Sequence, residues 1–146
     1  MTEDLFRLIY CSRSAMPPDL VGLQMEQIVA EARRANAASD VTGALIYNEG
    51  IFAQLLEGPF GAVRRIFERI QDDPRHEDVL LIQAHITANR VFGAWPMACA
   101  EVDDAYAAAR VLRQALMDPS TEGPHNVLLL LENLVRRAGQ EVPMAA

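Results

Sequence analysis

The segment 42–47, Thr-Gly-Ala-Leu-Ile-Tyr, is a predicted strand that is apolar on both of its faces. Side chains alternate between the two faces of a strand, so Ala44 and Ile46 share one face while Leu45 and Tyr47 share the other. A sheet face in contact with water would carry polar residues at every second position. We therefore expect other elements to cover both faces of the sheet, which predicts a protein of three layers.

Alternating and helical spacings predict the remaining elements of the first hundred residues. Further strands are expected at 6–12, 51–56, 79–84 and 97–102. Asp19 is the predicted N-cap of a helix that ends near Asn36, and Pro59 suits the first turn of a second helix that stops before Pro74. The resulting order βαββαββ predicts an α+β protein with a ferredoxin-like fold and a five-stranded sheet.

The last forty or so residues carry two further apolar stripes at helical spacing. One stripe lies within 105–116 and the other within 127–135, on either side of a segment bounded by Pro119 and Pro124. We expect two helices on one face of the sheet and these two C-terminal helices on the other. Residues 1–102 then form the main domain, and residues 103–146 form a helical extension of the same structural unit.

Composition excludes several classes of protein. Thirteen Lys and Arg residues against twenty Asp and Glu residues give a net charge of −7. Such a chain repels nucleic-acid backbones, and its longest apolar run, 127–131, is far shorter than the roughly 20 residues of a membrane span. Its acidic start does not resemble a signal peptide. With only two cysteines we expect a cytoplasmic protein without nucleic-acid or membrane partners.

The chemistry-bearing residues show no arrangement typical of an enzyme or a metal site. His76 and His85 have no His, Cys or acidic neighbours at ligand spacing. The glycines do not form a phosphate-binding loop, and the sequence holds no nucleophile elbow. We expect neither a metal nor an enzymatic activity.

Three polar residues fit poorly into a plain core. Gln54 lies in the middle of a predicted strand, where an unpaired buried amide costs about 1–3 kcal/mol. A solvent-facing glutamine on an edge strand is the ordinary alternative. Tyr10 raises the same question, since buried tyrosines usually bond to a local acceptor for structural reasons. Asn36 is explained equally well as a left-handed residue that ends a helix.

Five short motifs, taken in series, resemble the BLUF family of flavin-binding blue-light sensors. They cover about residues 5 to 102 in the order typical of the family. Each motif alone is weak, but five in series are specific because chance matches multiply. The matching pieces are 8–12 (Leu-Ile-Tyr-Cys-Ser), Asn36 with 41–45, 52–59 (Phe-Ala-Gln-Leu-Leu-Glu-Gly-Pro), Ile70 with 73–76, and Arg90 with Phe92, Trp95 and Met97.

The resemblance implies a flavin site. Ile28 and Ile70 would enclose the flat isoalloxazine ring, and Asn36 would hold its carbonyl edge. Tyr10 and Gln54 correspond to the photochemical pair of the family, and Trp95 and Met97 to the last-strand residues that exchange burial on illumination. The implied flavin-binding residues are Ile28, Asn36, Gln54, Arg69, Ile70 and Asp73.

The function implied by the resemblance is that of a blue-light photoreceptor. Flavin excitation would drive reversible electron and proton transfer with Tyr10 and rearrange the hydrogen bonds of Gln54. The signal would pass through the last strand and the C-terminal helices to a separate effector protein, within a homo-oligomer. FAD is the expected cofactor, with FMN and riboflavin as alternatives. Two other functions remain open, a flavin-binding redox module without a photocycle and a cofactor-free interaction domain.

Overall fold

The computed structural model describes residues 5–48 and 50–90 continuously, together with 98–100, 110–111, 113–114, 117, 126–127 and 129–131. A short 3₁₀ turn, η1 (Pro18–Leu20), precedes the first helix. The order of strands and helices is β1 (Leu5–Ser14), α1 (Val21–Ala38), β2 (Thr42–Asn48), β3 (Ile51–Pro59), α2 (Phe60–Asp72), β4 (His76–Thr87) and β5 (Ala98–Ala100). This is the predicted order βαββαββ, and the α+β class is confirmed.

The strands form a sheet in the order β4-β1-β3-β2-β5. The first four are mutually antiparallel, and the three described residues of β5 run parallel to β2. β1 and β3 are therefore the strands in the middle of the sheet, while β4 lies at an edge. Side chains on β1 and β3 are shielded on both sides by neighbouring strands, which places Tyr10 and Gln54 in the interior.

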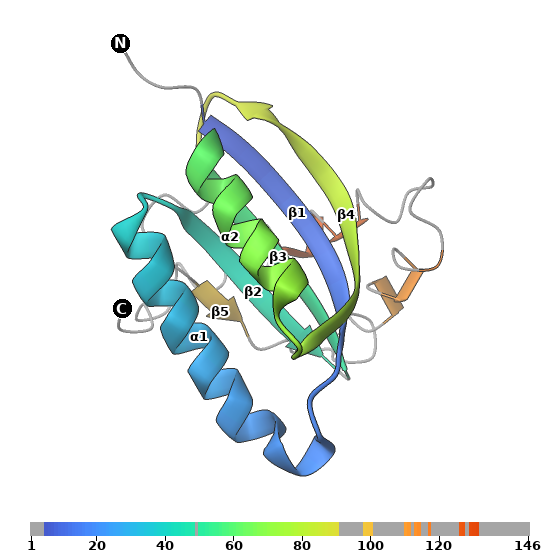
Figure 1. Cartoon of the computed structure of the whole chain (residues 1–146). Helices are drawn as coiled ribbons and strands as arrows, with labels where there is room; N and C mark the ends of the chain where they lie inside the picture. The colour runs from blue at the N-terminus through green and yellow to red at the C-terminus, as the bar shows by residue number, and fades with distance from the viewer. Residues whose placement is uncertain are drawn as a thin grey trace.

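Helices α1 and α2 cover one face of the sheet (Figure 1). The apolar stripe of α2 buries Val63 and Ile66 against the sheet, and α1 buries Ile28. These side chains share one apolar cluster with Leu8, Tyr10, Leu45, Phe52 and Leu56 of the strands. The apolar side chains at alternate strand positions therefore pack against the apolar stripe of α2, as predicted.

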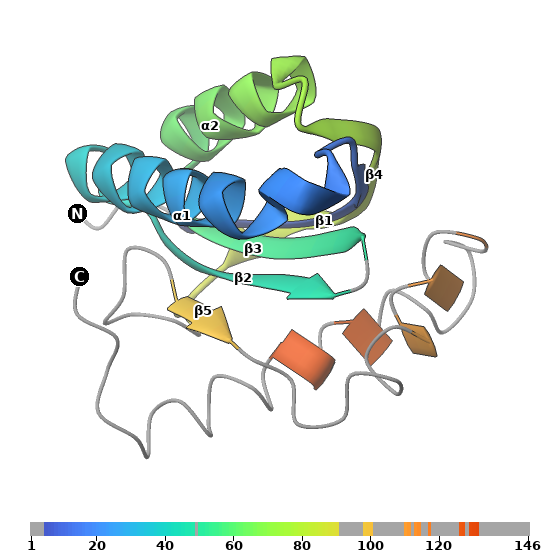
Figure 2. The ribbon, with the colours of Figure 1, turned by 90° about the horizontal axis from the view of Figure 1, so that it is seen from below.

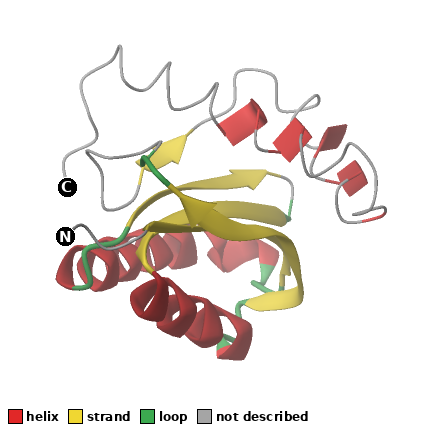
Figure 3. Ribbon diagram, turned by 90° about the horizontal axis from the view of Figure 1, so that it is seen from above, coloured by secondary structure: helices red, strands yellow, loops and turns green. Residues whose placement is uncertain are grey.

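The opposite face of the sheet has its own apolar cluster. Ile9, Ala44, Ile46 and Leu55 pack there with Val127 and Leu131 from the C-terminal part of the chain. The described residues of that part have helical geometry and lie on the side of the sheet away from α1 and α2 (Figures 2 and 3). The described C-terminal residues Val127 and Leu131 thus lie where the third layer is expected. The full extents of the two expected C-terminal helices lie outside the described residues.

Two details of α1 differ from the sequence-based expectation. Asp19 is not the N-cap: it lies in η1, and Leu20 precedes the helix without a side-chain hydrogen bond. Asn36 is not the terminal residue either, because the helix continues to Ala38. Instead Asp40 takes the left-handed conformation, with φ of 56°. The Asn36 carbonyl accepts hydrogen bonds from the amides of Ser39 and Val41, which ends the helix.

Strands β2 and β3 approach each other closely at Gly43. A Cβ atom at this position would overlap the carbonyl oxygen of Leu55 on the neighbouring strand. Glycine is required here because it is the residue without a Cβ. The Thr-Gly pair that begins the apolar segment 42–47 therefore has a packing role.

A buried ion pair lies on the back face of the same region. Arg7 Nε donates to Glu57 Oε2 at 2.8 Å, and the Glu57 side chain is fully buried. Arg90 donates from Nη1 to the Glu57 carbonyl oxygen at 3.3 Å and from Nη2 to the Asp40 carbonyl oxygen at 2.9 Å. These contacts tie Arg90, three residues after the end of β4, to β3 and to the loop before β2. Among the residues described, no helix has the length and apolar composition of a transmembrane span.

Candidate functional site

A cavity of about 310 Å³ lies between α1, α2 and the sheet. Its wall is apolar where the two helices face each other, with Ile28 and Ala32 from α1 and Ile66 and Ile70 from α2. Its polar groups come from both helices, from β3, from the segment that joins α2 to β4 and from the first residue of β4. The polar lining residues are Glu31, Asn36, Gln54, Arg69, Asp73, Arg75 and His76.

Tyr10 and Gln54 form a buried hydrogen-bonded pair beside this cavity. They are direct cross-strand partners of β1 and β3, and the Tyr10 hydroxyl donates to Gln54 Oε1. Gln54 is 4% exposed and Tyr10 is fully buried. A solvent-facing Gln54 on an edge strand is therefore ruled out, because β3 is a central strand and the side chain points toward the helices.

Burial dominates the protonation chemistry of Tyr10. Desolvation raises the pKa of its hydroxyl far above the ordinary value of 10.0, and the nearby groups Cys11 and Asp73 raise it further. Tyr10 is therefore a neutral hydrogen-bond donor throughout the physiological pH range. Burial also raises the pKa of the Cys11 thiol to about 12. Cys11 belongs to the cluster on the opposite face of the sheet, so its thiol stays protonated and away from the cavity.

An ion-pair network lines the cavity at the start of β4. Arg75 contacts both carboxylate oxygens of Asp73, from Nη2 at 2.7 Å and from Nε at 3.0 and 3.1 Å. Its Nη2 also donates to Glu31 Oε2 on α1 at 2.8 Å. Burial alone would raise the Asp73 pKa, but the hydrogen bonds and charge of Arg75 outweigh it and lower the pKa. Arg75 thus joins α1 to the loop after α2.

His76 is a further polar residue of the cavity. Its Nδ1 lies 2.8 Å from Ser12 Oγ, and its exposed fraction is 9%. The ring packs against Phe52, with centroids 4.5 Å apart, and approaches Tyr10 edge-on at 6.2 Å. Burial lowers the His76 pKa, with Asp73 opposing this effect and Arg75 adding to it. His76 is therefore neutral near pH 7.

The structure brings the six candidate flavin-binding residues to this one cavity. Ile28, Asn36, Gln54, Arg69, Ile70 and Asp73 all line it. Tyr10 reaches it through Gln54. Trp95 and Met97 lie outside the described residues. Sequence reasoning did not assign a role to the lining residues Glu31, Ala32, Ala35, Ile66, Arg75 and His76. Arg75 and His76 lie in the motif 73–76, and Ile66 lies in the apolar stripe of α2. These two patterns could have identified the three residues as part of the site.

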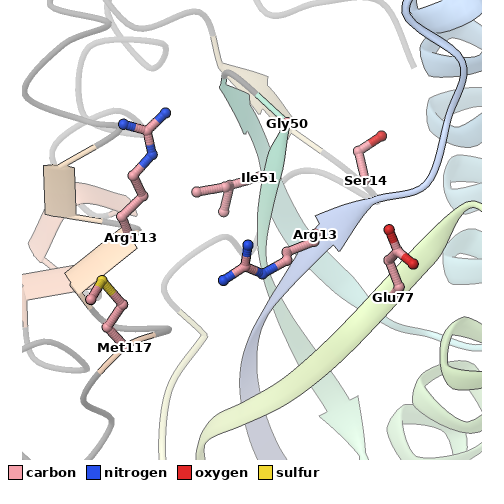
Figure 4. Close-up of a pocket in the computed structure, with 7 residues that line it drawn as sticks. All are labelled: Arg13, Ser14, Gly50, Ile51, Glu77, Arg113 and Met117. Atoms are coloured by element: carbon pink, nitrogen blue, oxygen red, sulfur yellow. The ribbon is translucent and has the colours of Figure 1, made fainter.

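A second hollow of about 490 Å³ lies at the far end of the sheet (Figure 4). Arg13, Ser14 and Glu77 border it on the strand side, and Arg113 and Met117 border it on the side of the C-terminal part. Its walls carry three charged side chains and contain none of the expected site residues. A flat aromatic ring is better accommodated by the apolar slot between α1 and α2.

Metal binding has no support in the part of the chain that the structure describes. No group of three or more His, Cys, Asp or Glu side chains is close enough there to hold a metal ion. Gln54, Arg75 and His76 of the cavity instead take part in hydrogen bonds or ion pairs with neighbouring side chains. Such a set suits an organic ligand with several polar edges.

The fold and cavity together define an α+β domain with a largely apolar slot between two helices and a buried tyrosine–glutamine pair beside that slot. Residues 5–98 match the family described as "Sensors of blue-light using FAD", or BLUF. The chain belongs to this family. It carries a blue-light sensor domain, and the domains of this family bind flavin.

Two curated relatives are similar over about three fifths of this chain. The photoactivated adenylate cyclase subunit alpha of Euglena gracilis is 40% identical over 90 residues, which are 62% of this chain and 9% of that protein. The blue light- and temperature-regulated antirepressor BluF of Escherichia coli (strain K12) is 40% identical over 89 residues, which are 61% of this chain and 22% of that protein.

A solved structure matches over almost the whole chain. The dark-state structure of BlrB, described as a BLUF protein, has a TM-score of 0.76 and 29% identity, and the match covers 94% of this chain and 99% of that one. The two curated relatives are much longer proteins, and this chain spans less than a quarter of their length. The region shared with the cyclase is 9% of that protein, so the similarity assigns no enzymatic activity to this chain.

Proposed function

We propose that this protein is a blue-light photoreceptor in which Tyr10 and Gln54 are the photochemical pair beside a flavin held between α1 and α2. One observation carries the proposal: Gln54 both lines the cavity and accepts the hydrogen bond of the Tyr10 hydroxyl. A ligand in the cavity is thereby linked to Tyr10 through a single side chain.

The cavity fits the ring of a flavin in both shape and chemistry. Ile28 and Ile70 come from facing helices and supply apolar surfaces for the two sides of a flat ring. The amides of Asn36 and Gln54 supply donors and acceptors for its polar edge. A volume of about 310 Å³ is at the lower end for ligand cavities, which run from roughly 300 to 1,000 Å³. The slot therefore accommodates the ring, and the tail of the flavin extends outside it.

FAD is the flavin form we assign, following the family. A tail that leaves the slot carries phosphate groups, which need a cation near the cavity opening. Arg75 is occupied by two carboxylates, Asp73 and Glu31. Arg69, at the end of α2 and exposed, is the lining cation we assign to the phosphates. FMN would use the same contact, whereas riboflavin would leave Arg69 without a phosphate.

The residues of the site suggest how light absorption changes hydrogen bonding. Bound flavin would supply blue-light absorption and an excited state that accepts an electron. The high pKa of Tyr10 opposes loss of its proton alone, so the proton leaves the hydroxyl only together with an electron and returns with it. Gln54 receives the hydrogen bond of that hydroxyl, so its amide rotates or changes tautomer during the cycle. No atom is gained or lost overall, and only the donors and acceptors around the ring differ.

Strand pairing offers a route for the signal. Leu45 on β2 is the cross-strand partner of Gln54 on β3 and also of Cys99 on β5. A rearranged Gln54 side chain therefore lies two strands away from the last strand, and its direct neighbour on β2 touches both. We assign Trp95 and Met97, just before β5, as the residues that respond. The C-terminal helices on the back of the sheet would then carry the change to a partner.

The partner side of the proposal rests on the same helices. Leu129 is 47% exposed although Val127 and Leu131 are fully buried. The helix thus carries apolar side chains on its outer side as well as on its buried side, and the outer side is available for contact with another protein. We assign a homo-oligomer and a separate effector protein in the cytoplasm to this surface. Light scattering in the dark and under blue light measures the oligomer directly, and a Leu129→Glu variant with unchanged mass would contradict the assignment of this surface.

The proposed function is tested by absorption spectra of the purified protein in the dark and under blue light. We expect a flavin spectrum that shifts slightly to the red and returns in darkness. Gln54→Leu should keep the flavin and lose the shift, whereas Gln83→Leu, on the edge strand β4, should behave like the wild type. A flavin that only bleaches would identify a redox module. A colourless protein that takes up no added flavin would identify an interaction domain.

A further inference from the structure

We infer that the Ser12–His76 pair belongs to the photochemical site, as a positioning element that makes the light reaction of Tyr10 dependent on the charge of His76. The inference rests on the proposed function of Tyr10 and Gln54. None of the relatives or motifs described above assigns a role to this pair.

The geometry places His76 beside Ser12, Phe52 and Tyr10 at the wall of the cavity. Ser12 lies two residues beyond Tyr10 on β1, on the same face of the sheet, and its Oγ is 2.8 Å from His76 Nδ1. The imidazole lines the cavity beside Gln54. Its ring centroid is 6.2 Å from that of Tyr10 and 4.5 Å from that of Phe52. The backbone amide of His76 donates to the Asp73 carbonyl oxygen at 3.1 Å, which holds the main chain of His76 against the loop after α2.

The two protonation states of His76 make different demands on Ser12. In the neutral state with the proton on Nε2, Nδ1 accepts the hydrogen bond of the Ser12 hydroxyl. In the protonated state Nδ1 becomes a donor, so Ser12 must accept and its own hydrogen must turn elsewhere. Protonation therefore reorganises a buried hydroxyl on the strand that carries Tyr10.

Protonation also changes the electrostatics of Tyr10. As the electron leaves, positive charge develops on the phenol ring until the proton has also left the hydroxyl, and an imidazolium about 6 Å away repels that developing charge in a poorly screened interior. The neutral imidazole exerts no such repulsion. Electron transfer from Tyr10 is therefore efficient with neutral His76 and hindered when His76 is protonated.

Other charged groups near His76 set where this change falls on the pH scale. Asp73 favours the protonated form and Arg75 opposes it, and both belong to the loop before β4. Glu31 on α1 acts through its ion pair with Arg75. Tyr10 on β1 stays neutral, and Arg69 on α2 lines the same cavity. Burial is the largest influence and lowers the His76 pKa, so the transition lies below the ordinary value of about 6.5.

The test is the photoproduct yield per absorbed photon as a function of pH, measured on the flavin-loaded protein. The titration runs from pH 8 to pH 5.5, because the protein approaches its isoelectric point of about 4.9 below that range. We expect the wild-type yield to fall at least about twofold toward pH 5.5, with a midpoint below about 6.5. His76→Gln keeps a hydrogen-bonding side chain without a titrating charge, and its yield should not vary with pH over this range.

A matched control and a second readout separate this inference from the proposed function. His85→Gln, on the same strand and partly buried, should retain the wild-type pH profile. Nitrogen-15 NMR of the flavin-loaded protein in the dark should show His76 with an unprotonated Nδ1 at pH 7.5, and Ser12→Ala should change that signal. If the yield of His76→Gln fell with pH as it does in the wild type, the role of the pair would be overturned. A protonated Nδ1 of His76 at pH 7.5 would overturn it as well. If the wild type formed no photoproduct at any pH, the proposed function would instead be contradicted.

Discussion

Tyr10 and Gln54 face each other directly across the two central strands of the sheet, and the Tyr10 hydroxyl donates to Gln54 Oε1. Sheet register fixes this relationship, because a slip of one residue between β1 and β3 would move Gln54 to the opposite face. The pair therefore depends on strand pairing along the whole length of β1 and β3. Neither residue depends on a loop for its position.

The proposal that the cavity between the helices holds the flavin can be tested by filling the cavity with a larger side chain. Ile28 lines the cavity and is only 8% exposed. Ile28→Trp should occupy the slot and reduce flavin affinity by about tenfold or more, because overpacking of this kind costs about 1–3 kcal/mol. Leu23 on the same helix is 58% exposed, so Leu23→Trp should leave the flavin affinity unchanged. The ratio of flavin to protein absorbance measures both, and equal loading of the two variants would contradict the assignment of this cavity.

Gly43 should be intolerant of any side chain. An added Cβ would overlap the backbone oxygen of Leu55, and a backbone atom in a central sheet cannot move aside. Gly43→Ala should reduce the free energy of unfolding by about 3 kcal/mol. Gly22→Ala in the first turn of α1 meets no atoms within 4 Å, so it should raise stability by up to about 1 kcal/mol. Urea denaturation of the two variants provides the comparison, and a neutral Gly43→Ala would mean that β2 and β3 are further apart.

The Arg7–Glu57 pair should contribute far more to stability than an exposed pair. Glu57→Gln leaves the largely buried Arg7 guanidinium without its carboxylate, and breaking a buried pair costs about 3 kcal/mol or more. Glu68→Gln breaks the exposed pair with Arg64 on α2 and should cost less than about 0.5 kcal/mol. Similar denaturation midpoints for the two variants would show that Arg7 is well solvated.

Stability should decrease on mild acidification because of His76. Its folded pKa is lowered mainly by burial, so below about pH 6.5 the unfolded chain takes up a proton that the folded protein resists. The stability present above pH 6.5 is therefore lost progressively as the pH falls. Asp73 also has a lowered pKa, but a carboxylate of this kind loses its contribution only at still lower pH. Between pH 7.5 and 5.5 the unfolding free energy should fall less in His76→Gln than in His85→Gln, and equal slopes would contradict the prediction.

Much of the fold was predictable because its main signals are local. Apolar alternation identified the strands, and the apolar segment 42–47 required cover on both faces. The edge strand was the weakest prediction: β4 was expected at 79–84 and spans His76–Thr87. Exposed and partly buried positions alternate along it, so its ends lack the apolar residues that mark a central strand. The run of apolar residues that predicts a strand is therefore shorter in β4 than the strand itself.

The site was only partly readable from composition and spacing. Nothing local distinguishes a buried Gln54 from a solvent-facing one, because the difference lies in the position of β3 within the sheet. The resemblance supplied that information, and the six residues that it implies line one cavity, while their contact with a flavin stays a prediction. His76 was dismissed as a metal ligand, and its contact with Ser12 joins residues 64 positions apart. Such a contact depends on strand order, which spacing along the chain does not reveal.

The central claim is that Tyr10 drives the light response, and the most direct measurement is the light-minus-dark absorption spectrum of Tyr10→Phe beside the wild type. Phenylalanine removes the hydroxyl and its hydrogen bond to Gln54 while keeping the ring in the core. Tyr47→Phe is the matched control, since Tyr47 packs against Phe52 on the same face without lining the cavity. We predict a reversible red shift of the flavin spectrum in the wild type and in Tyr47→Phe. In Tyr10→Phe we predict a yellow protein with no shift, and a normal shift in that variant would contradict the account.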